Sequence, residues 1–277
     1  MRTIKLVSAF EKANDYIKAV EESNEDIQKA WHKYMIEPFW TEISKWAPHN
    51  IDFMKPAPIK NIDALKEQIK IFSSFPIEEL HSEFVKITSM IPQDDDDPIL
   101  VALFPLCDDE NIVKERQNGI VGACAFGNII ININPLAHDY SNWIPYVFAH
   151  EYHHSVLGHN LYVLRGGKGL SGSFYENMII EGQADLFAES LFYDLIPKWN
   201  RPFDNETEEK LWKRLKNDPS THNASMFGDE AKNLPWCMGY SLGRAIVDDY
   251  MRKHPSTSFS DLLNVLPVDI LNGSRFK

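Results

Sequence analysis

The stretch His150–Glu151–Tyr152–His153–His154 has the form H-E-x-x-H, and the interpretation of the whole chain starts from it. On a helix, residues four apart lie on one face, so His150 and His154 can direct two imidazoles at one metal ion. Glu151 lies about 100° further round the helix, where its carboxylate can reach a metal-bound water without binding the metal. Two neutral imidazoles suit zinc, and a carboxylate beside a zinc-bound water suits general-base hydrolysis.

The residues around this motif predict a helix from about 143 to 157. Ser141 and Asn142 followed by Pro145 form a helix-start signal, and Gly158 suits a helix end. Apolar residues surround the motif, so we expect a partly buried, dry site. The alternative is a core helix whose polar residues fall on one side by chance, but burying His and Glu without partners would be costly.

A catalytic zinc site needs a third protein ligand and one open position for water. His159 is one candidate, because a large class of zinc peptidases has the pattern H-E-x-x-H-x-x-G-x-x-H. In this chain Leu157 and Asn160 stand where that pattern requires glycine and histidine. We therefore expect His159 to be a histidine at a helix end.

The second candidate for the third ligand lies downstream. Ser173 with Glu176 forms a capping box, which predicts the start of a second, largely apolar helix. Glu181 and Asp185 interrupt its apolar character and lie one turn apart on a shared face. Two inward carboxylates in such a helix require a partner, and a metal with a histidine is a suitable one. Gly182 would let this helix approach the H-E-x-x-H helix closely.

H-E-x-x-H followed by E-x-x-x-D on a second helix resembles the gluzincin metallopeptidases, the thermolysin-like class. The resemblance implies that Glu181 is the third zinc ligand and that Asp185 hydrogen-bonds and orients His150. The sequence H-E-Y-H-H … I-I-E-G-Q-A-D-L-F is also similar to that of the YjaZ-like family of predicted zinc-dependent proteases. Residues 239–243, G-Y-S-L-G, are similar to the downstream G-Y-x-x-G of that family. The resemblance extends from about residue 85 to 255, but the gap between the two metal motifs is longer than in thermolysin.

Dense apolar segments predict the strands of a small sheet ahead of the metal helix, and loose alternation over 2–8 predicts a further short strand. We expect an α+β fold, mostly helical, in which this sheet packs on the H-E-x-x-H helix as a gluzincin-like (zincin) catalytic core. We further expect a helical N-terminal region, 1–92, packed on a metallopeptidase domain, 93–277. The predicted strands are 2–8, 99–104, 119–127 and 128–133, and the predicted N-terminal helices lie within 14–46, 62–72 and 77–90.

The resemblance also implies a strand that binds substrate. In this class an edge strand pairs with the extended peptide, whose backbone N–H and C=O groups are unsatisfied. An internal hairpin is the alternative interpretation of the same segment. The residues to which the role is assigned have small side chains that would admit a close backbone: Gly122, Ala123, Cys124 and Ala125.

Hydrolysis needs a hydrogen-bond donor opposite the metal to stabilise the oxyanion. Because the class uses Tyr or His in this role, Tyr240 is the first candidate and His222, expected in a loop over 217–234, is the second. Tyr240 lies in a helix expected over 234–253, where simple core packing is the alternative. Arg244, one turn later, is expected to pair with an acid such as Asp248.

Composition narrows the class of protein. The 277 residues carry 44% hydrophobic and 25% charged residues, as expected of a globular protein, and a formal charge of −12. That charge argues against nucleic acid and anionic membranes as partners. Three cysteines without a C-x-x-C pair argue against a disulfide framework. The start lacks a signal-peptide pattern, so a cytoplasmic location is expected. The acidic run 94–97 lacks the further ligands of a calcium loop and is expected to be solvated.

The sequence thus predicts a zinc-dependent peptidase with Zn²⁺ as its cofactor and a peptide or protein as its substrate. Glu151 would take the proton of the attacking water and deliver it to the leaving amine. Two other functions stay open: a zinc hydrolase acting on a non-peptide substrate, and a non-catalytic, zinc-bearing interaction module.

Overall fold

The fold is that of a computed structural model, which describes residues 2–93, 97–107 and 111–277. Of the expected acidic loop at 94–97, residues 94–96 lie outside the described residues. The chain divides into two compact units, one up to Ser155 and one from Val156 onward. Each unit is described by itself.

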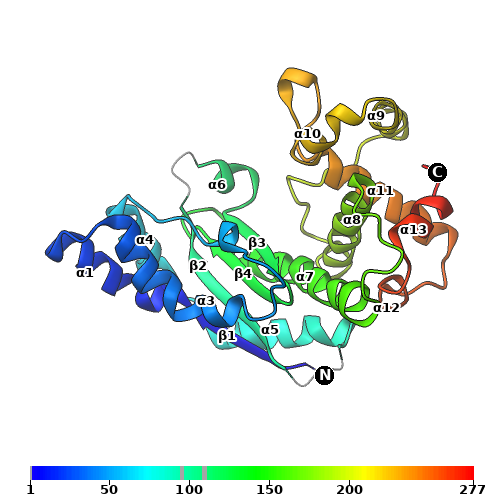
Figure 1. The fold of residues 1–277 in the computed structure, drawn as a ribbon. Coiled ribbons are helices and arrows are strands. Elements are labelled where there is room, and N and C mark those ends of the chain that lie inside the picture. Colours follow the sequence, from blue (N-terminus) through cyan, green and yellow to red (C-terminus); the bar gives the residue numbers. More distant parts are fainter. Residues whose placement is uncertain (1, 94–96, 108–110) are drawn as a thin grey trace. The chain divides into compact units, whose positions relative to one another are not determined.

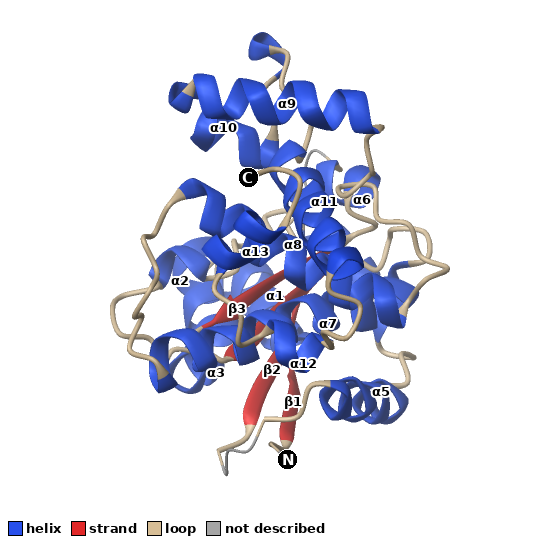
Figure 2. Ribbon diagram, turned by 90° about the vertical axis from the view of Figure 1, so that its right-hand side faces the viewer, coloured by secondary structure: helices blue, strands red, loops and turns tan. Residues whose placement is uncertain are grey.

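The first unit is built on a four-stranded mixed sheet, whose strands are drawn in red in Figure 2, and the strand order is β1-β2-β4-β3. The pairs β1–β2 and β2–β4 are parallel, whereas β3 runs antiparallel to β4 and forms a hairpin with it. All predicted strands are confirmed, with small shifts at their ends. Their bounds are Ile4–Ser8 for β1, Ile99–Pro105 for β2, Ile120–Ala125 for β3 and Asn128–Ile133 for β4.

Both faces of this sheet are covered by helices (Figure 1). Every residue of β2 is buried, which is the pattern of a strand enclosed on both sides. Alternate residues such as Leu100 and Phe104 pack in one core with the N-terminal helices. On the other face, Val147 of α7 lies against Gly122, and the rings of Phe84 and Phe148 stack at 3.8 Å between α5 and α7.

The helices of the first unit follow the predicted pattern closely. The segments predicted at 62–72 and 77–90 are confirmed, and Pro38 lies in the first turn of α3. Their bounds are Ala13–Ser23 (α1), Ile27–Trp31 (α2), His32–Ile36 (η2, a π-helix), Glu37–Ile43 (α3), Ile62–Phe72 (α4), Ile77–Met90 (α5), Ile112–Arg116 (α6) and Tyr140–Gly158 (α7).

Helix α7, which carries the H-E-x-x-H motif, differs from the prediction at both ends. It begins at Tyr140, and Pro145 therefore lies inside it rather than at its start. Gly158 does not end the helical segment, because its backbone is right-handed (φ −60°) and the chain continues as the π-helix η4, His159–Leu164. The first glycine with a positive φ after this helix is Gly166, with φ 60°.

The second unit is helical. Its core joins residues of α8, α9, α11 and α13, among them Met178, Trp212 and Ile246. Helix α11 begins at Met238 instead of 234, and His222 begins a short helix instead of lying in a loop. The bounds are Phe174–Leu191 (α8), Asn205–Asn217 (α9), His222–Phe227 (α10), Met238–Lys253 (α11), Phe259–Leu262 (α12) and Pro267–Gly273 (α13).

The structure is mostly helical with one small mixed sheet, so the predicted α+β class is confirmed. The division of the chain at residue 92 stays a prediction. Strand β1, which belongs to the expected N-terminal region, pairs directly with β2. Among the described residues, none of the helices combines the length and the apolar character needed to cross a bilayer.

Candidate metal centre

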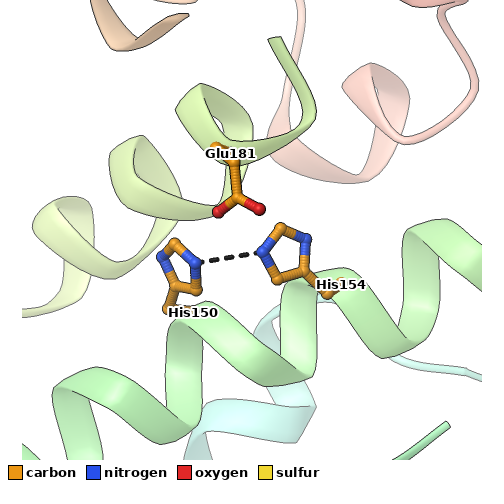
Figure 3. A group of neighbouring side chains, drawn as sticks. All are labelled: His150, His154 and Glu181. Carbon is orange, nitrogen blue, oxygen red and sulfur yellow. Dashed lines mark hydrogen bonds between the residues drawn. The ribbon is translucent and has the colours of Figure 1, made fainter. Parts of the chain in front are cut away.

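Three side chains from the two predicted metal motifs meet at one point. Each of His150, His154 and Glu181 offers a ligand atom, and these atoms all lie within 4.8 Å of one another. The two Nε2 atoms of the histidines are 3.0 Å apart, and the Glu181 carboxylate faces both rings (Figure 3). His150 is buried, while the other two side chains are partly exposed.

This group fits a zinc ion in donor type and spacing. Two imidazole nitrogens and one carboxylate oxygen are a common zinc-binding set in hydrolases. Zn–N bonds of about 2.0–2.1 Å at a tetrahedral angle would place the two Nε2 atoms about 3.3–3.4 Å apart. The observed 3.0 Å needs only a small outward movement of either ring. Three protein ligands would leave the fourth tetrahedral position for water or substrate.

Helix α7 is held to its own unit beside the metal ligands. The hydroxyl of the buried Tyr152 donates to the carbonyl of Ile91 at 3.0 Å. The hydroxyl of Ser155 donates to the carbonyl of Gly127, in the turn of the β3–β4 hairpin, at 2.9 Å. These two bonds on either side of His153 fix where the motif lies relative to the sheet.

Glu151 lies directly against strand β3. It is 7% exposed, and a Cβ atom placed on Gly122 would be only 2.5 Å from both its Cγ and its Oε1. Burial and, next, the nearby charge of Glu151 raise the pKa of the Cys124 thiol to about 12. The carboxylate of the H-E-x-x-H glutamate therefore sits beside the even-numbered residues of this strand.

Strand β3 pairs on one side only within the described part of the sheet, so it is an edge strand. The hairpin turn, Phe126 and Gly127, has positive φ at both positions. Such a two-residue turn makes Ala125 and Asn128 a hydrogen-bonded pair, and the bond from Asn134 N–H to the Gly119 carbonyl continues that alternation. The backbone N–H and C=O groups of the even residues consequently point away from β4.

Helix α8 carries Glu181, and its start is built as predicted. The Ser173 hydroxyl accepts from the Glu176 N–H, and the Glu176 carboxylate accepts in return from the Ser173 N–H. The close approach that Gly182 allows within its own unit is to α11. A Cβ atom there would clash with the backbone of Gly243 and Arg244.

Three carboxylates follow one another along one stripe of α8 at four-residue spacing: Glu181, Asp185 and Glu189. Asp185 is fully buried. Arg244 pairs with Glu189, with its Nε 2.9 and 2.8 Å from the two carboxylate oxygens, rather than with Asp248. Burial raises the pKa of Glu189 despite the adjacent guanidinium.

The two candidate oxyanion donors lie in different surroundings. Tyr240 is partly buried in the first turns of α11, with its ring 6.1 Å from that of Phe227. His222 stacks on Phe174 with ring centroids 4.6 Å apart, and its Nε2 lies 3.0 Å from the carbonyl oxygen of Leu215. These contacts tie the His222 ring to the core of the second unit.

Comparison with known proteins places the chain in a family. The model of a family described as "Predicted Zn-dependent protease (DUF2268)" matches residues 77–272. The chain belongs to this family. The matched residues extend beyond the range of about 85 to 255 expected from the sequence motifs. The expected membership in a family of predicted zinc-dependent proteases is confirmed.

A curated relative of this family member is the uncharacterized protein YjfC of Bacillus subtilis (strain 168). It is 30% identical over 157 residues, which is 49% of this chain. The chain spans about half the length of this relative, 50%. No solved structure matches the chain.

Proposed function

We propose that this chain is a zinc-dependent peptidase that hydrolyses peptide bonds with Glu151 as its general base. One observation carries the proposal: the ligand atoms of His150, His154 and Glu181 gather within 4.8 Å, one residue from a buried glutamate that is not part of the group. Membership in a family of predicted zinc-dependent proteases supports it.

The three ligands would hold zinc, which when bound lowers the pKa of a coordinated water and polarises a carbonyl. Glu151 accepts the proton of the attacking water and donates it to the leaving amine. Its near-complete burial keeps competing water away from the transferred proton. Asp185, on the next turn of α8, orients His150 and fixes which ring nitrogen carries the proton.

A peptide substrate would bind as an additional strand on β3. The outward N–H and C=O groups of Gly122 and Cys124 offer the hydrogen bonds that an extended backbone needs. The small side chains of Gly122, Ala123, Cys124 and Ala125 leave room for that backbone. Because Glu151 lies against Gly122, a peptide on this edge would run past the general base.

Tyr240 is the proposed donor to the oxyanion. Its phenol can donate one hydrogen bond to the negative charge that develops on the carbonyl oxygen. His222 is the weaker candidate, because its Nε2 lies beside the Leu215 carbonyl and its ring is stacked on Phe174. The substitution Tyr240→Phe should lower kcat by about 10²-fold with little change in KM.

The decisive experiment compares metal content and peptide cleavage in two variants. Glu151→Gln should keep one zinc per chain but lose hydrolysis of a peptide library read by mass spectrometry. Glu181→Ala should lose the zinc itself, measured by elemental analysis after dialysis. Wild-type turnover in Glu151→Gln would refute the general base.

The same data separate the alternatives. A non-peptide zinc hydrolase would bind zinc through the same ligands yet leave every library peptide intact while cleaving an ester or amide substrate in a Glu151-dependent way. A non-catalytic module would bind zinc, show no turnover, and lose nothing on Glu151→Gln substitution.

A further inference from the structure

Among the elements that the structure describes, α8 and α11 make the most extensive contact with each other, and they lie side by side in the second unit (Figure 1). We propose that their crossing at Gly182 and Gly243, together with the Arg244–Glu189 pair, positions Glu181 and thereby sets the affinity for the metal. The inference rests on the proposed metal site and assigns a role to the G-Y-x-x-G segment.

The crossing brings backbone against backbone. A Cβ atom on Gly182 would lie under 3.0 Å from the backbone of Gly243 and Arg244. A Cβ atom on Gly243 would lie under 3.0 Å from the backbone carbonyl of Met178. None of these atoms belongs to a side chain that can rotate aside, so any added methyl group must push the two helices apart.

Glu181 immediately precedes the glycine at this crossing, so it moves with that part of α8. Relieving such overlaps requires a shift on the order of 1 Å, because ordinary carbon contacts lie at about 3.5–4.0 Å. A metal ligand tolerates deviations of only about 0.2 Å from its normal bond length. The metal site should therefore respond to the separation of the helices more sharply than the packing of the core does.

The Arg244–Glu189 pair fixes the rotation of α8 about its axis. Arg244 approaches Glu189 through two nitrogens, with Nε and Nη2 both 2.8 Å from Oε2. Glu189 also accepts a hydrogen bond from Asn200 at 3.1 Å. Glu181 lies two turns earlier on the same stripe, so holding Glu189 in place limits how far the Glu181 carboxylate can swing.

The other glycine of the motif provides a matched control. Gly239 lies on the same helix as Gly243, but a Cβ atom there would meet Met226 of α10, at 2.6 Å from Sδ and 2.8 Å from Cα. Gly239→Ala therefore crowds α11 against α10, away from the crossing with α8. Gly239→Ala and Gly243→Ala should both destabilise the metal-free protein, but only Gly243→Ala should displace Glu181.

The test is zinc affinity, measured by competition with a chromophoric chelator, alongside the unfolding midpoint of each metal-free protein. We expect Gly243→Ala and Gly182→Ala to weaken zinc binding at least 10-fold, within the range of 10- to 100-fold typical of residues that support metal ligands. Gly239→Ala should stay within about twofold of the wild type even if it destabilises the apoprotein equally.

If the glycine variants fail to fold, Arg244→Lys tests the proposal instead. Lysine keeps the positive charge but cannot approach Glu189 through two nitrogens. A several-fold loss of zinc affinity in this variant would support the proposal. Wild-type affinity in Arg244→Lys or in a folded Gly243→Ala would overturn it. A wild-type protein that binds no zinc would instead overturn the proposed function itself, which separates the two failures.

Discussion

Gly122 sets the position of the glutamate that is proposed to act as the base. Its hydrogen leaves the space in which the Glu151 side chain lies, and a Cβ atom there would also be 2.6 Å from Cγ1 of Val147. Since Val147 is short, branched and buried, the longer Glu151 side chain, which has more rotatable bonds, would have to move. One missing methyl group on the strand thus fixes the location of a carboxylate on the helix.

Gly122→Ala should therefore lower the activity by about 10²-fold while leaving the metal in place. A displacement of the base by about 1 Å can cost about 10²-fold in rate, and the atoms nearest to the added methyl group belong to Glu151 and Val147 rather than to the proposed metal ligands. Zinc content by elemental analysis and kcat on a cleaved peptide would check the two parts of the prediction.

Gly158→Ala is the matched control for this substitution. Apart from its chain neighbours and the backbone of its own helix, no described atom lies within 4 Å of where its Cβ would be, and its helical backbone accepts alanine. This variant should keep full activity and gain up to about 1 kcal/mol of stability. A fully active Gly122→Ala protein would show that Glu151 has another way to reach its place.

At the scale of elements, the start of α8 is fixed by a buried carboxylate. Glu176 accepts hydrogen bonds from the N–H groups of Ser171 at 2.8 Å, Gly172 at 2.6 Å and Ser173 at 3.3 Å. Burial alone would raise the pKa of Glu176, but these backbone donors outweigh it and the pKa is lowered. The negative charge of the Glu176 carboxylate also interacts favourably with the positive, N-terminal end of the helix dipole.

Glu176→Gln should lower the free energy of unfolding at pH 7 by about 1–3 kcal/mol, because charged acceptors make the stronger bonds. A lowered pKa in the folded state means that the stabilisation is present above the unfolded-state pKa and is lost as the pH falls through the folded-state pKa. The difference in unfolding free energy between the variant and the wild type should accordingly become smaller at acidic pH. Urea unfolding at pH 7 and below pH 4 would measure it.

Glu206→Gln offers a comparison at the first turn of α9. Glu206 is exposed and pairs with Lys210 at 2.6 Å, an arrangement worth about 0.3–0.5 kcal/mol. Its variant should differ little from the wild type at either pH. If the loss of unfolding free energy in Glu176→Gln were the same at every pH, the charge of Glu176 would not stabilise the helix start.

At the scale of the whole molecule, the proposed metal site would couple metal binding to stability. A ligand that binds only the folded state stabilises it by about 4 kcal/mol when its concentration is a thousand times its dissociation constant. His150, His154 and Glu181 gather only in the folded chain, because Glu181 is distant in sequence from both histidines. A metal bound at the proposed site would therefore add to the free energy of unfolding.

Removing zinc with a chelator should lower the Tm of the wild type, and adding zinc back should restore it. Glu181→Ala should melt at the same temperature with or without chelator, since it lacks a ligand. Scanning calorimetry with measured metal content would check both. If the Tm of the wild-type protein did not change when zinc was shown to be removed, the proposal that the metal site forms on folding would be contradicted.

Much of this protein follows from its sequence, because the relevant spacings are local. The helical period alone places His150 and His154 on one face, and a capping box alone starts α8 at its observed residue. Apolar runs bounded by turn residues locate the strands of the sheet. Each of these depends on interactions between residues a few positions apart.

Tertiary structure decided what those local elements face. Only it brings the Glu181 carboxylate to the two imidazoles, turns Gly182 toward α11, and pairs Arg244 with Glu189 instead of Asp248. Helical periodicity says which residues share a stripe but not which neighbour packs against it. That choice depends on contacts between residues far apart in the chain, which no local pattern encodes.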